Sequence, residues 1–269
     1  MYRVSKVLNN NGVIAIDMDE NKEYVILGKG VGFGKKVSQR FDKPEGCTTY
    51  RLEQETERGS AKELVKGIEP EYLEIADAIL TESQKVFGDS IDRGILFPLA
   101  DHISFAVARI RRNEQISNPL TEDIKVLFYS EFKVAETLKT ILRERLQIEI
   151  DDHEVGYVAL HIHSAIGDEK VSVAMQTARA VRECIDMIEK ATGKPIDVLS
   201  LSYNRLMNHM KYMVARASTG EKLNLDMNEY MLDQYPQAYK VATDICKNLE
   251  GCIAVSYTHL RAHETDQYL

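Results

Sequence analysis

The chain has 269 residues, which at roughly 100–200 residues per domain predicts two or three domains. Its 42 acidic and 34 basic residues give a formal charge of -8, so no overall positive field points to a nucleic acid or a membrane surface as partner. A hydrophobic content of 44% and a charged content of 28% exclude wholesale disorder.

The first 41 residues are basic, in contrast to the rest of the chain. They carry seven lysines and arginines against four acidic residues, a charge of +3, so the remaining 228 residues sum to -11. A site for a polyanion must therefore be local, and this basic head is where we expect one.

Residues 1–55 are predicted to form a small antiparallel β-sheet. Four short β-rich runs, at 2–8, 12–17, 23–27 and 48–52, are separated by turn sequences such as Asn9-Asn10-Asn11-Gly12. An Asn-Gly pair favours a tight turn because both residues tolerate positive φ. Since two hairpins of this size bury little apolar surface, we expect the sheet to pair with a second copy, which predicts a homodimer.

From about residue 60 the apolar residues recur at helical spacing, so the body of the chain is predicted to be mostly α-helical. Three amphipathic faces stand out, running through residues 73–80, 99–110 and 124–138. Pro98 suits a first helical turn, and Asn118-Pro119 is expected to break the chain before the next helix.

An internal repeat divides this helical body into two copies. The stretch 102–109 (HISFAVAR) matches 209–216 (HMKYMVAR) at an offset of 107 residues, and at the same offset 132–135 (FKVA) falls on 239–242 (YKVA). Because two separate blocks agree on one gapless offset, we infer two all-helical domains of roughly 100 residues, beginning near residues 66 and 173. The period is too long for a solenoid repeat.

Histidine is the titratable residue that the two copies share. His102 lies within the apolar face 99–110, on or beside the buried stripe, and His209 is its counterpart. A half-buried structural histidine is the simplest interpretation, but recurrence in both copies indicates that a nucleophilic ring nitrogen is used. Arg109 and Arg216 follow the histidines by seven residues. They could respond to a charge there, although a structural ion pair is the favoured interpretation.

His161 and His163 resemble the HxH pair of metal-dependent hydrolases, which gives an alternative function. In a strand the two side chains would share a face, but the surrounding sequence is helical and separates them by about 200°. We therefore expect His161 on the side of Val158, and His163 and His153 facing the solvent. The hydrolase alternative requires the pair to converge with a carboxylate. No metal site and no cofactor are predicted.

Two motifs of the head occur together, Lys6 to Asn11 (KVLNNN) and Gly28 to Lys36 (GKGVGFGKK). In this combination they resemble the co-antiterminator (CAT) RNA-binding domain of the BglG/SacY family of transcriptional antiterminators. The body resembles two regulation domains of the sugar phosphotransferase system (PTS). Asp101-His102 and 155–162 (VGYVALHI) match the histidine motifs of the first domain, and Asn208-His209 matches that of the second.

The resemblance covers roughly residues 1–255 and implies a multidomain fold. A small dimeric antiparallel β-sheet that binds RNA would occupy 1–57, followed by all-α helical-bundle regulation domains at 66–172 and 173–255. The offset of 107 places the counterpart of His161 at Tyr268, where no histidine motif is found. We therefore expect the second bundle to be incomplete and residues 256–269 to be a non-native, adapter-derived tail in which His259 and His263 have no role.

The resemblance also implies a function and partners. A sugar-responsive regulator, not an enzyme, would bind an RNA hairpin in a leader transcript and prevent an overlapping terminator from forming. Phosphorylation would control it. The PTS sugar permease (enzyme II) would phosphorylate His102 and His161 to inhibit, and HPr would phosphorylate His209 to activate.

The chemistry of the head agrees with RNA binding, the alternative being a turn-rich sheet with a solvated basic face. Asparagine side chains can hydrogen-bond unpaired base edges, an aromatic ring can stack on a base, glycines allow close backbone approach, and lysines contact phosphates. Lys29 stands where many relatives carry arginine, which weakens bidentate contacts. The predicted RNA-binding residues are Lys6, Asn9, Asn11, Gly28, Lys29, Gly30, Phe33 and Lys35.

The N-terminal residues lack the apolar stretch of a secretory signal, and the longest apolar runs are too short to cross a bilayer. A cytoplasmic protein without membrane insertion is therefore expected. Four scattered cysteines with no CxxC pair are predicted to be free thiols: Cys47, Cys184, Cys246 and Cys252.

Overall fold

A computed structural model describes residues 1–53, 55–56, 59–114, 116–167, 170–196, 200–219 and 228–249. The chain divides into two compact units. The first comprises Met1–Thr121 and Phe128–Val171, and the second comprises Glu122–Leu127 and Ser172–Leu269. The expected tail at 256–269 lies outside the described residues.

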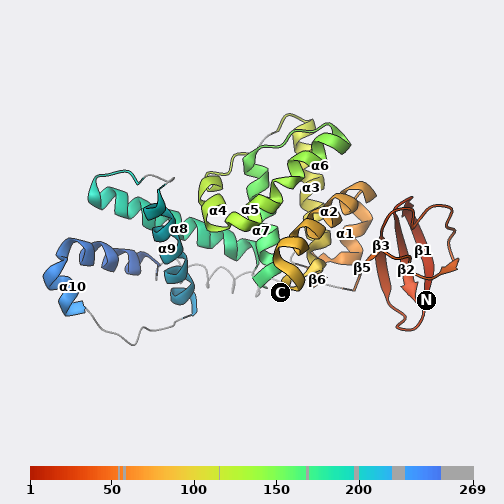
Figure 1. Ribbon diagram of the computed structural model, residues 1–269, viewed down its shortest axis with the longest axis horizontal. Coiled ribbons are helices and arrows are strands. Elements are labelled where there is room, and N and C mark those ends of the chain that lie inside the picture. The colour runs from red at the N-terminus through yellow and green to blue at the C-terminus, as the bar shows by residue number, and fades with distance from the viewer. Residues whose placement is uncertain are drawn as a thin grey trace, which may run out of the picture. The chain divides into compact units, whose positions relative to one another are not determined.

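The first unit begins with a five-stranded antiparallel sheet in the order β4-β1-β2-β3-β5, drawn in red to orange in Figure 1. All four predicted strands are present. They are β1 (Tyr2–Asn9), β2 (Gly12–Asp17), β3 (Glu23–Leu27) and β5 (Thr48–Arg51), and the short β4 (Arg40–Phe41) pairs with the start of β1. Asn9 lies opposite Gly12, so the turn falls in the predicted segment but consists of Asn10 and Asn11. Gly12 already belongs to β2, and neither turn residue has the positive φ expected of an Asn-Gly turn.

One face of this sheet holds the core of the head. Val13 and Ala15 of β2 alternate with outward residues, as a half-buried strand requires, and pack with Ile26 of β3. Val31 and Cys47 complete the core from the long connection between β3 and β5. That connection therefore covers the inner face, and its first half, residues 28–36, is called the glycine loop below.

Backbone contacts fix the glycine loop against the β1–β2 turn. The Gly28 N–H donates to the carbonyl of Asn11 at 2.9 Å, and the Gly32 N–H donates to that of Asn10 at 3.0 Å. A Cβ on Gly32 would overlap the carbonyl oxygen of Asn9, and one on Gly28 would overlap Cys47. Gly32 is needed because the backbones of the loop and the turn touch here, and Gly28 is needed because Cys47 packs against it.

A small hairpin and six helices follow within the first unit. The hairpin pairs β6 (Glu55–Thr56) with β7 (Gly59–Ser60), and α2 packs on α3 while α5 packs on α7. Two short 3₁₀ helices, η1 (Gly88–Ser90) and η2 (Arg93–Ile95), connect α2 to α3. The helices are α1 (Ala61–Gly67), α2 (Pro70–Phe87), α3 (Leu96–Arg111), α5 (Tyr129–Ala135), α6 (Thr137–Leu146) and α7 (Asp152–Gly167).

The first two amphipathic faces are buried as predicted. Leu73 and Ile79 of α2 and Leu99 of α3 have no exposed surface, and Pro98 lies in the first turn of α3. Asn118 ends the preceding segment, and its side-chain oxygen accepts from the Leu120 N–H at 3.0 Å just before the next helix starts. Within the described ranges, no helix is long and apolar enough to cross a membrane.

The third amphipathic face, at 124–138, is not one helix as its periodicity predicts. It is divided among α4 (Thr121–Leu127), α5 and α6. The first break lies at Phe128, whose φ of -123° and ψ of 48° leave the helical region. The break allows residues 122–127 to pack with the second unit while α5 stays in the first.

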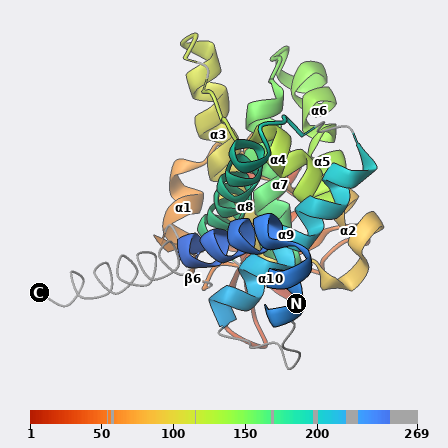
Figure 2. The same ribbon diagram turned by 90° about the vertical axis from the view of Figure 1, so that its left-hand side faces the viewer.

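The second unit contains residues 122–127 with α8 (Val171–Thr192), α9 (Leu201–Thr219), α10 (Asn228–Gln234) and a further helical stretch at 236–249. The helices α8 to α10 run from teal to blue in Figures 1 and 2. The buried Tyr203 hydroxyl donates to the carboxylate of Asp123 at 3.1 Å. Burial raises the pKa of Asp123, although Tyr203 and the Arg182 guanidinium act against that shift.

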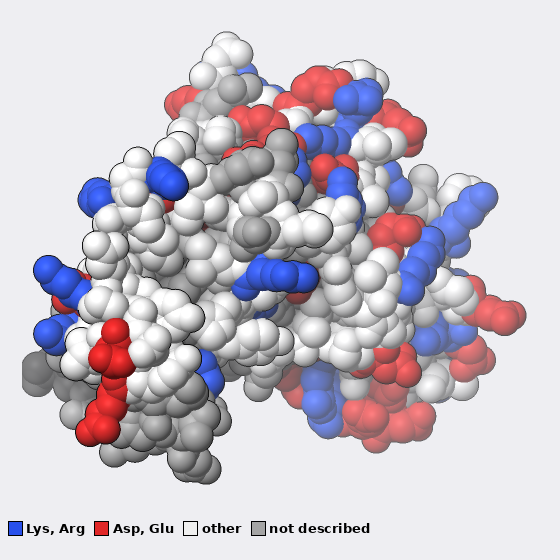
Figure 3. Space-filling view, turned by 60° about the vertical axis from the view of Figure 1, so that its left-hand side comes forward, with Lys and Arg blue, Asp and Glu red and all other residues white. Residues whose placement is uncertain are grey.

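Charge on the helical body is mixed. On the face drawn in Figure 3, lysine and arginine side chains are interspersed with acidic ones rather than gathered into a basic field. Among the described residues, Cys47, Cys184 and Cys246 form no disulfide, and Cys252 lies outside the described residues.

The contact between the glycine loop and the turn can be tested with Gly32→Ala. Because the added methyl meets a backbone carbonyl rather than a flexible side chain, we expect a loss of about 2 kcal/mol in the local opening free energy of β1 and β2. Amide hydrogen exchange of these strands measures that quantity. Gly67→Ala is the control, since its Cβ meets nothing within 4 Å. Equal exchange in both variants would contradict the assignment.

Candidate nucleic-acid interface and buried histidine pair

The β1–β2 turn orients two asparagine side chains through their oxygens. The Asn9 Oδ1 accepts from the backbone N–H of Asn11 at 2.8 Å. The Asn11 Oδ1 accepts from the N–H of Gly30 at 3.0 Å, which ties it to the glycine loop. With the oxygens held by the backbone, the amide nitrogens of both side chains are directed away from the turn and can donate to another molecule.

The glycine loop adds an aromatic ring and positive charge beside these amides. Phe33 is 74% exposed, an unusual position for a large apolar side chain. Lys29 is exposed on the same loop, and Lys6 is exposed on β1. Neither forms an ion pair within the described part of the chain. The Lys35 ammonium lies 5.1 Å from the centre of the Phe41 ring.

The structure thus brings most of the predicted RNA-binding residues onto one turn and one loop. Gly28 and Gly30 have an evident structural use there. Gly28 lies against Cys47, and Gly30 adopts a φ of +74° while its N–H holds Asn11. Lys35 is also part of the loop, with its ammonium over the Phe41 ring of β4, and Lys6 lies on β1.

Sequence reasoning missed a carboxylate that faces this turn. Glu74 of α2 accepts hydrogen bonds from the side-chain amides of both Asn9 and Asn11. One turn further along α2, Asp77 accepts from the Tyr50 hydroxyl of β5 and from the Arg93 guanidinium. No periodicity distinguishes Glu74 from other acidic residues of α2, because its role depends on how the helix packs against the sheet.

His102 of α3 and His161 of α7 form a buried pair. Their ring centres lie 5.3 Å apart, and the residues are 8% and 7% exposed. Glu154, about two turns before His161 on α7, places its Oε2 3.5 Å from the His102 Nε2. Its other oxygen accepts from the Arg109 guanidinium at 2.9 Å. The favoured interpretation of Arg109 as an ion-pair residue is therefore confirmed.

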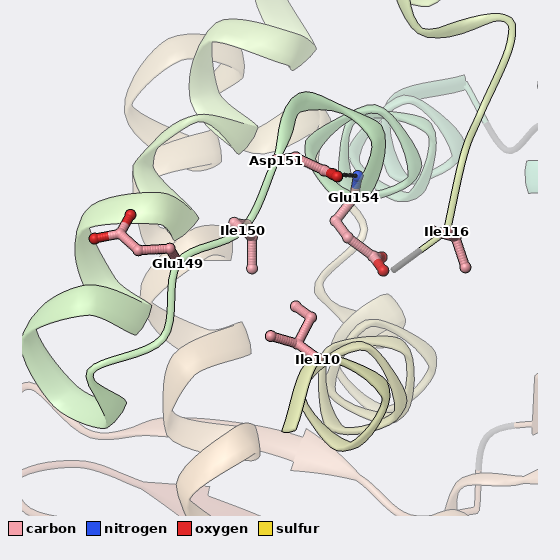
Figure 4. Close-up of a pocket in the computed structure, with 6 residues that line it drawn as sticks. All are labelled: Ile110, Ile116, Glu149, Ile150, Asp151 and Glu154. Carbon is pink, nitrogen blue, oxygen red and sulfur yellow. Dashed lines mark hydrogen bonds between the residues drawn. The ribbon is translucent and has the colours of Figure 1, made fainter. Parts of the chain in front are cut away.

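Glu154 is a buried carboxylate that stays ionised. Burial alone would raise the pKa of Glu154, but the neighbouring His102 and the Arg109 guanidinium, which donates a hydrogen bond to it, outweigh burial and leave the pKa lowered. Figure 4 shows its side chain pointing from α7 toward Ile110 and Ile116, which line a shallow pocket with it. Its backbone N–H donates to Asp151 at 3.2 Å, which fixes the first turn of the helix.

His209 is placed differently from His102. It lies on α9, as the repeat predicts, but it is exposed. In the first unit α7 covers His102 with Glu154, Tyr157 and His161. The repeat offset puts the start of an equivalent helix near residue 259, outside the described residues.

The expectation that His153 and His163 face the solvent is wrong. The His163 Nδ1 lies 2.8 Å from the Glu131 carboxylate, and its ring packs against Phe128. The His153 Nδ1 lies 2.7 Å from the Thr121 hydroxyl. Both are half-buried because α5 and the start of α4 pack over that side of α7. His161 and His163 thus have separate surroundings, and no cluster suited to a metal occurs among the described residues.

Comparisons with known proteins match three stretches of the chain. Residues 2–59 match the model of the CAT RNA binding domain, and residues 77–165 and 182–258 match that of the PRD domain. The glcA/glcB genes antiterminator of Staphylococcus carnosus (strain TM300) is 30% identical over 255 residues, covering 93% of this chain and 88% of the relative. The transcription antiterminator LicT of Bacillus subtilis (strain 168) is 25% identical over 267 residues, covering 99% and 96%.

A solved structure is also similar. The crystal structure of GlcT CAT-PRDI aligns with a TM-score of 0.54 at 29% identity, over 62% of this chain and 98% of that one. The fold and the matches define an RNA-binding regulator with duplicated regulation domains, and the relatives are regulators rather than enzymes. The chain belongs to the BglG/SacY family of transcriptional antiterminators. The hydrolase alternative is dropped, because its two histidines do not converge.

The buried carboxylate can be tested with Glu154→Gln. Removing its charge leaves Arg109 and His102 without an anionic partner, so we expect a loss of about 2 kcal/mol in the stability of the first unit at neutral pH. Since the folded-state pKa of Glu154 is lowered, its contribution is present above the usual glutamate pKa of about 4.3 and disappears as the pH falls through the folded-state pKa.

Urea unfolding of both proteins between neutral and acidic pH measures this difference, which should shrink as the solution becomes acidic. Glu149→Gln is the control, because it breaks an exposed ion pair with Arg143 and should change stability little. A difference that persists unchanged at low pH would contradict the role given to the ionised carboxylate.

Proposed function

We propose that the chain is a sugar-responsive antiterminator. Its CAT domain binds an RNA hairpin in a leader transcript and thereby prevents an overlapping terminator from forming. The observation that carries the proposal is the hydrogen-bonded contact between the turn and the glycine loop: the turn presents two oriented asparagine amides, and the loop bound to it carries the exposed Phe33 and Lys29. The names of the relatives, antiterminators of transcription, support the same function.

Each part of this surface suits a different part of an RNA hairpin. The amides of Asn9 and Asn11 can donate to the edges of unpaired bases, and Phe33 can stack on a base that has left the helix. Lys6, Lys29 and Lys35 can contact phosphates, which position the RNA without reading its sequence.

The proposal includes a homodimer formed by the sheet. Val13 and Ala15 face the core, so Ile14 and Ile16 lie on the opposite face of β2, where they are only half-buried. A second copy packed on that face would cover them. Two copies would also present two turns to one RNA, which suits a hairpin with two unpaired regions.

We further propose that His102, His161 and His209 accept phosphate from PTS proteins in the cytoplasm. A ring nitrogen attacks the phosphorus of the phosphorylated donor, an N–P bond forms, and the donor's bond to phosphorus breaks with its electron pair returning to the donor. The sugar permease (enzyme II) is the proposed donor to His102 and His161, and HPr is the proposed donor to the exposed His209.

The surroundings of His102 explain why a phosphoryl group there would inhibit. Phosphate adds between one and two negative charges. On the Nε2 of His102 these charges would meet the Glu154 carboxylate, only 3.5 Å away, in a buried site. The repulsion would separate Glu154 from α3 and draw Arg109 to the phosphate, so the α3–α7 packing would change.

Phe33→Ala tests the RNA surface. Loss of one base-stacking contact weakens RNA binding by about tenfold to a hundredfold. The measurement is a gel-shift titration with hairpins carrying two internal loops, selected from a random pool by the unaltered chain. Phe105→Ala, which removes another exposed phenylalanine on α3, should leave binding unchanged. Equal binding by the two variants would refute this surface.

His102→Asp tests the inhibitory site. The substituted carboxylate lies beside Glu154 and imitates part of the phosphate charge, so we expect antitermination in cells to fall several-fold even with the inducing sugar present. A reporter gene placed behind the terminator measures it. His102→Asn carries no charge and should keep the inducer-dependent activity, and full activity of the aspartate variant would rule out an inhibitory role.

A further inference from the structure

Helix α2 supplies one carboxylate to both asparagines of the turn. The Asn9 Nδ2 donates to the Glu74 Oε1 at 2.7 Å, and the Asn11 Nδ2 donates to the Glu74 Oε2 at 3.2 Å. The guanidinium of Arg145, on α6, lies 3.6 Å from the same Oε2 and helps to orient the carboxylate. Glu74 therefore binds two side chains that are 63 and 65 residues away in the sequence.

These contacts use the groups that the turn leaves available. The oxygens of Asn9 and Asn11 accept from the backbone N–H groups of Asn11 and Gly30. Their nitrogens are the remaining polar atoms of the two side chains, and both donate to Glu74. Hydrogen bonds to an ionised acceptor are stronger than those between neutral groups, so a neutral base edge competes with Glu74 at a disadvantage.

A second contact holds α2 in place beside the sheet. Asp77 follows Glu74 by three residues and so lies on the same side of the helix. It accepts from the hydroxyl of Tyr50 on β5, and the Arg93 guanidinium binds both partners, at 2.7 Å from the Tyr50 oxygen and 2.8 Å from Asp77. Tyr50 is buried and packs edge-on against Phe97 of α3. These contacts hold α2, and with it Glu74, at the turn in addition to the hydrogen bonds that Glu74 itself makes.

We propose that Glu74 is an intramolecular competitor of RNA. In the RNA-free chain its carboxylate holds the amides of Asn9 and Asn11, and RNA must displace it to reach them. The negative charge adds a second obstacle, because it repels the phosphates of an approaching strand. This inference rests on the proposed function, in which the two asparagines contact RNA.

The competition works in both directions. If the contact with α2 weakens RNA binding, RNA binding must weaken the contact with α2 by the same factor. Helix α2 therefore controls RNA binding by the CAT domain directly. Any change of packing that withdraws α2 from the turn favours RNA binding.

The test uses the full chain and the selected hairpins, with binding measured by gel shift at fixed salt. Glu74→Ala frees both amides and removes one charge, so we expect RNA to bind about tenfold more tightly or better. Glu82→Ala is the matched control. It removes the same charge from the same helix, where the side chain pairs only with Lys85 among the contacts described, and it should leave binding unchanged. Circular dichroism checks that each variant is folded.

A double-mutant cycle locates the effect at the asparagines. If Glu74 acts through them, most of the gain from Glu74→Ala disappears in the Asn11→Ala background. Glu74→Gln keeps the shape of the side chain but not its charge, and it should bind more tightly than the unaltered chain but less tightly than Glu74→Ala. It decides the question if the alanine variant does not fold.

The outcomes separate this inference from the proposed function. Unchanged or weaker binding by Glu74→Ala and Glu74→Gln, together with weaker binding by Phe33→Ala, overturns the competition and leaves the RNA surface standing. Tighter binding by Glu82→Ala to the same degree assigns the gain to overall charge and also overturns it. If Phe33→Ala and Asn11→Ala both bind normally, the proposed RNA surface is wrong and the inference falls with it.

Discussion

The CAT domain depends on Asn9 and Asn11, in each of which the side-chain oxygen and nitrogen have different partners. Their oxygens accept backbone N–H groups of the turn and of the glycine loop, and this ties the loop that carries Phe33 and Lys29 to the turn. Their nitrogens remain to bind something outside the turn. Aspartate in either position would keep the acceptor and lose the donor, so only an amide serves both purposes. The glycine loop can approach the turn this closely because Gly32 carries no side chain, and Gly28 leaves room for Cys47.

Acidic residues of the helical body act locally rather than through the net charge. Glu74 accepts hydrogen bonds from the asparagines, Asp77 accepts one from Tyr50, and Glu154 lies between His102 and Arg109. In each case one carboxylate joins segments distant in sequence, and in each case a new charge or a removed one would alter how those segments pack. A regulator that responds to phosphate needs contacts of this kind, since phosphate acts by adding charge.

Much of the fold follows from local pattern. The strands, the position of the first turn and the burial of His102 were predictable because side-chain periodicity and turn chemistry act over a few residues. The break at Phe128, the half-buried His163 and the role of Glu74 were not, because each depends on which helix packs against which surface. Apolar spacing alone gave 124–138 as one face, whereas the packing of residues 122–127 with the second unit divides it. The RNA and phosphate assignments came from motif resemblance, and their residues remain proposals.

The most direct test of the proposed exchange is to observe the asparagine side chains themselves. Side-chain amide signals of Asn9 and Asn11 in the full chain, assigned by NMR, can be followed as a selected hairpin is added. If the amides leave Glu74 for RNA, both signals shift on titration, and Glu74→Ala shifts them before any RNA is present. Signals that stay in place while those of the glycine loop move would show that RNA binds without using these amides, which would contradict the central claim.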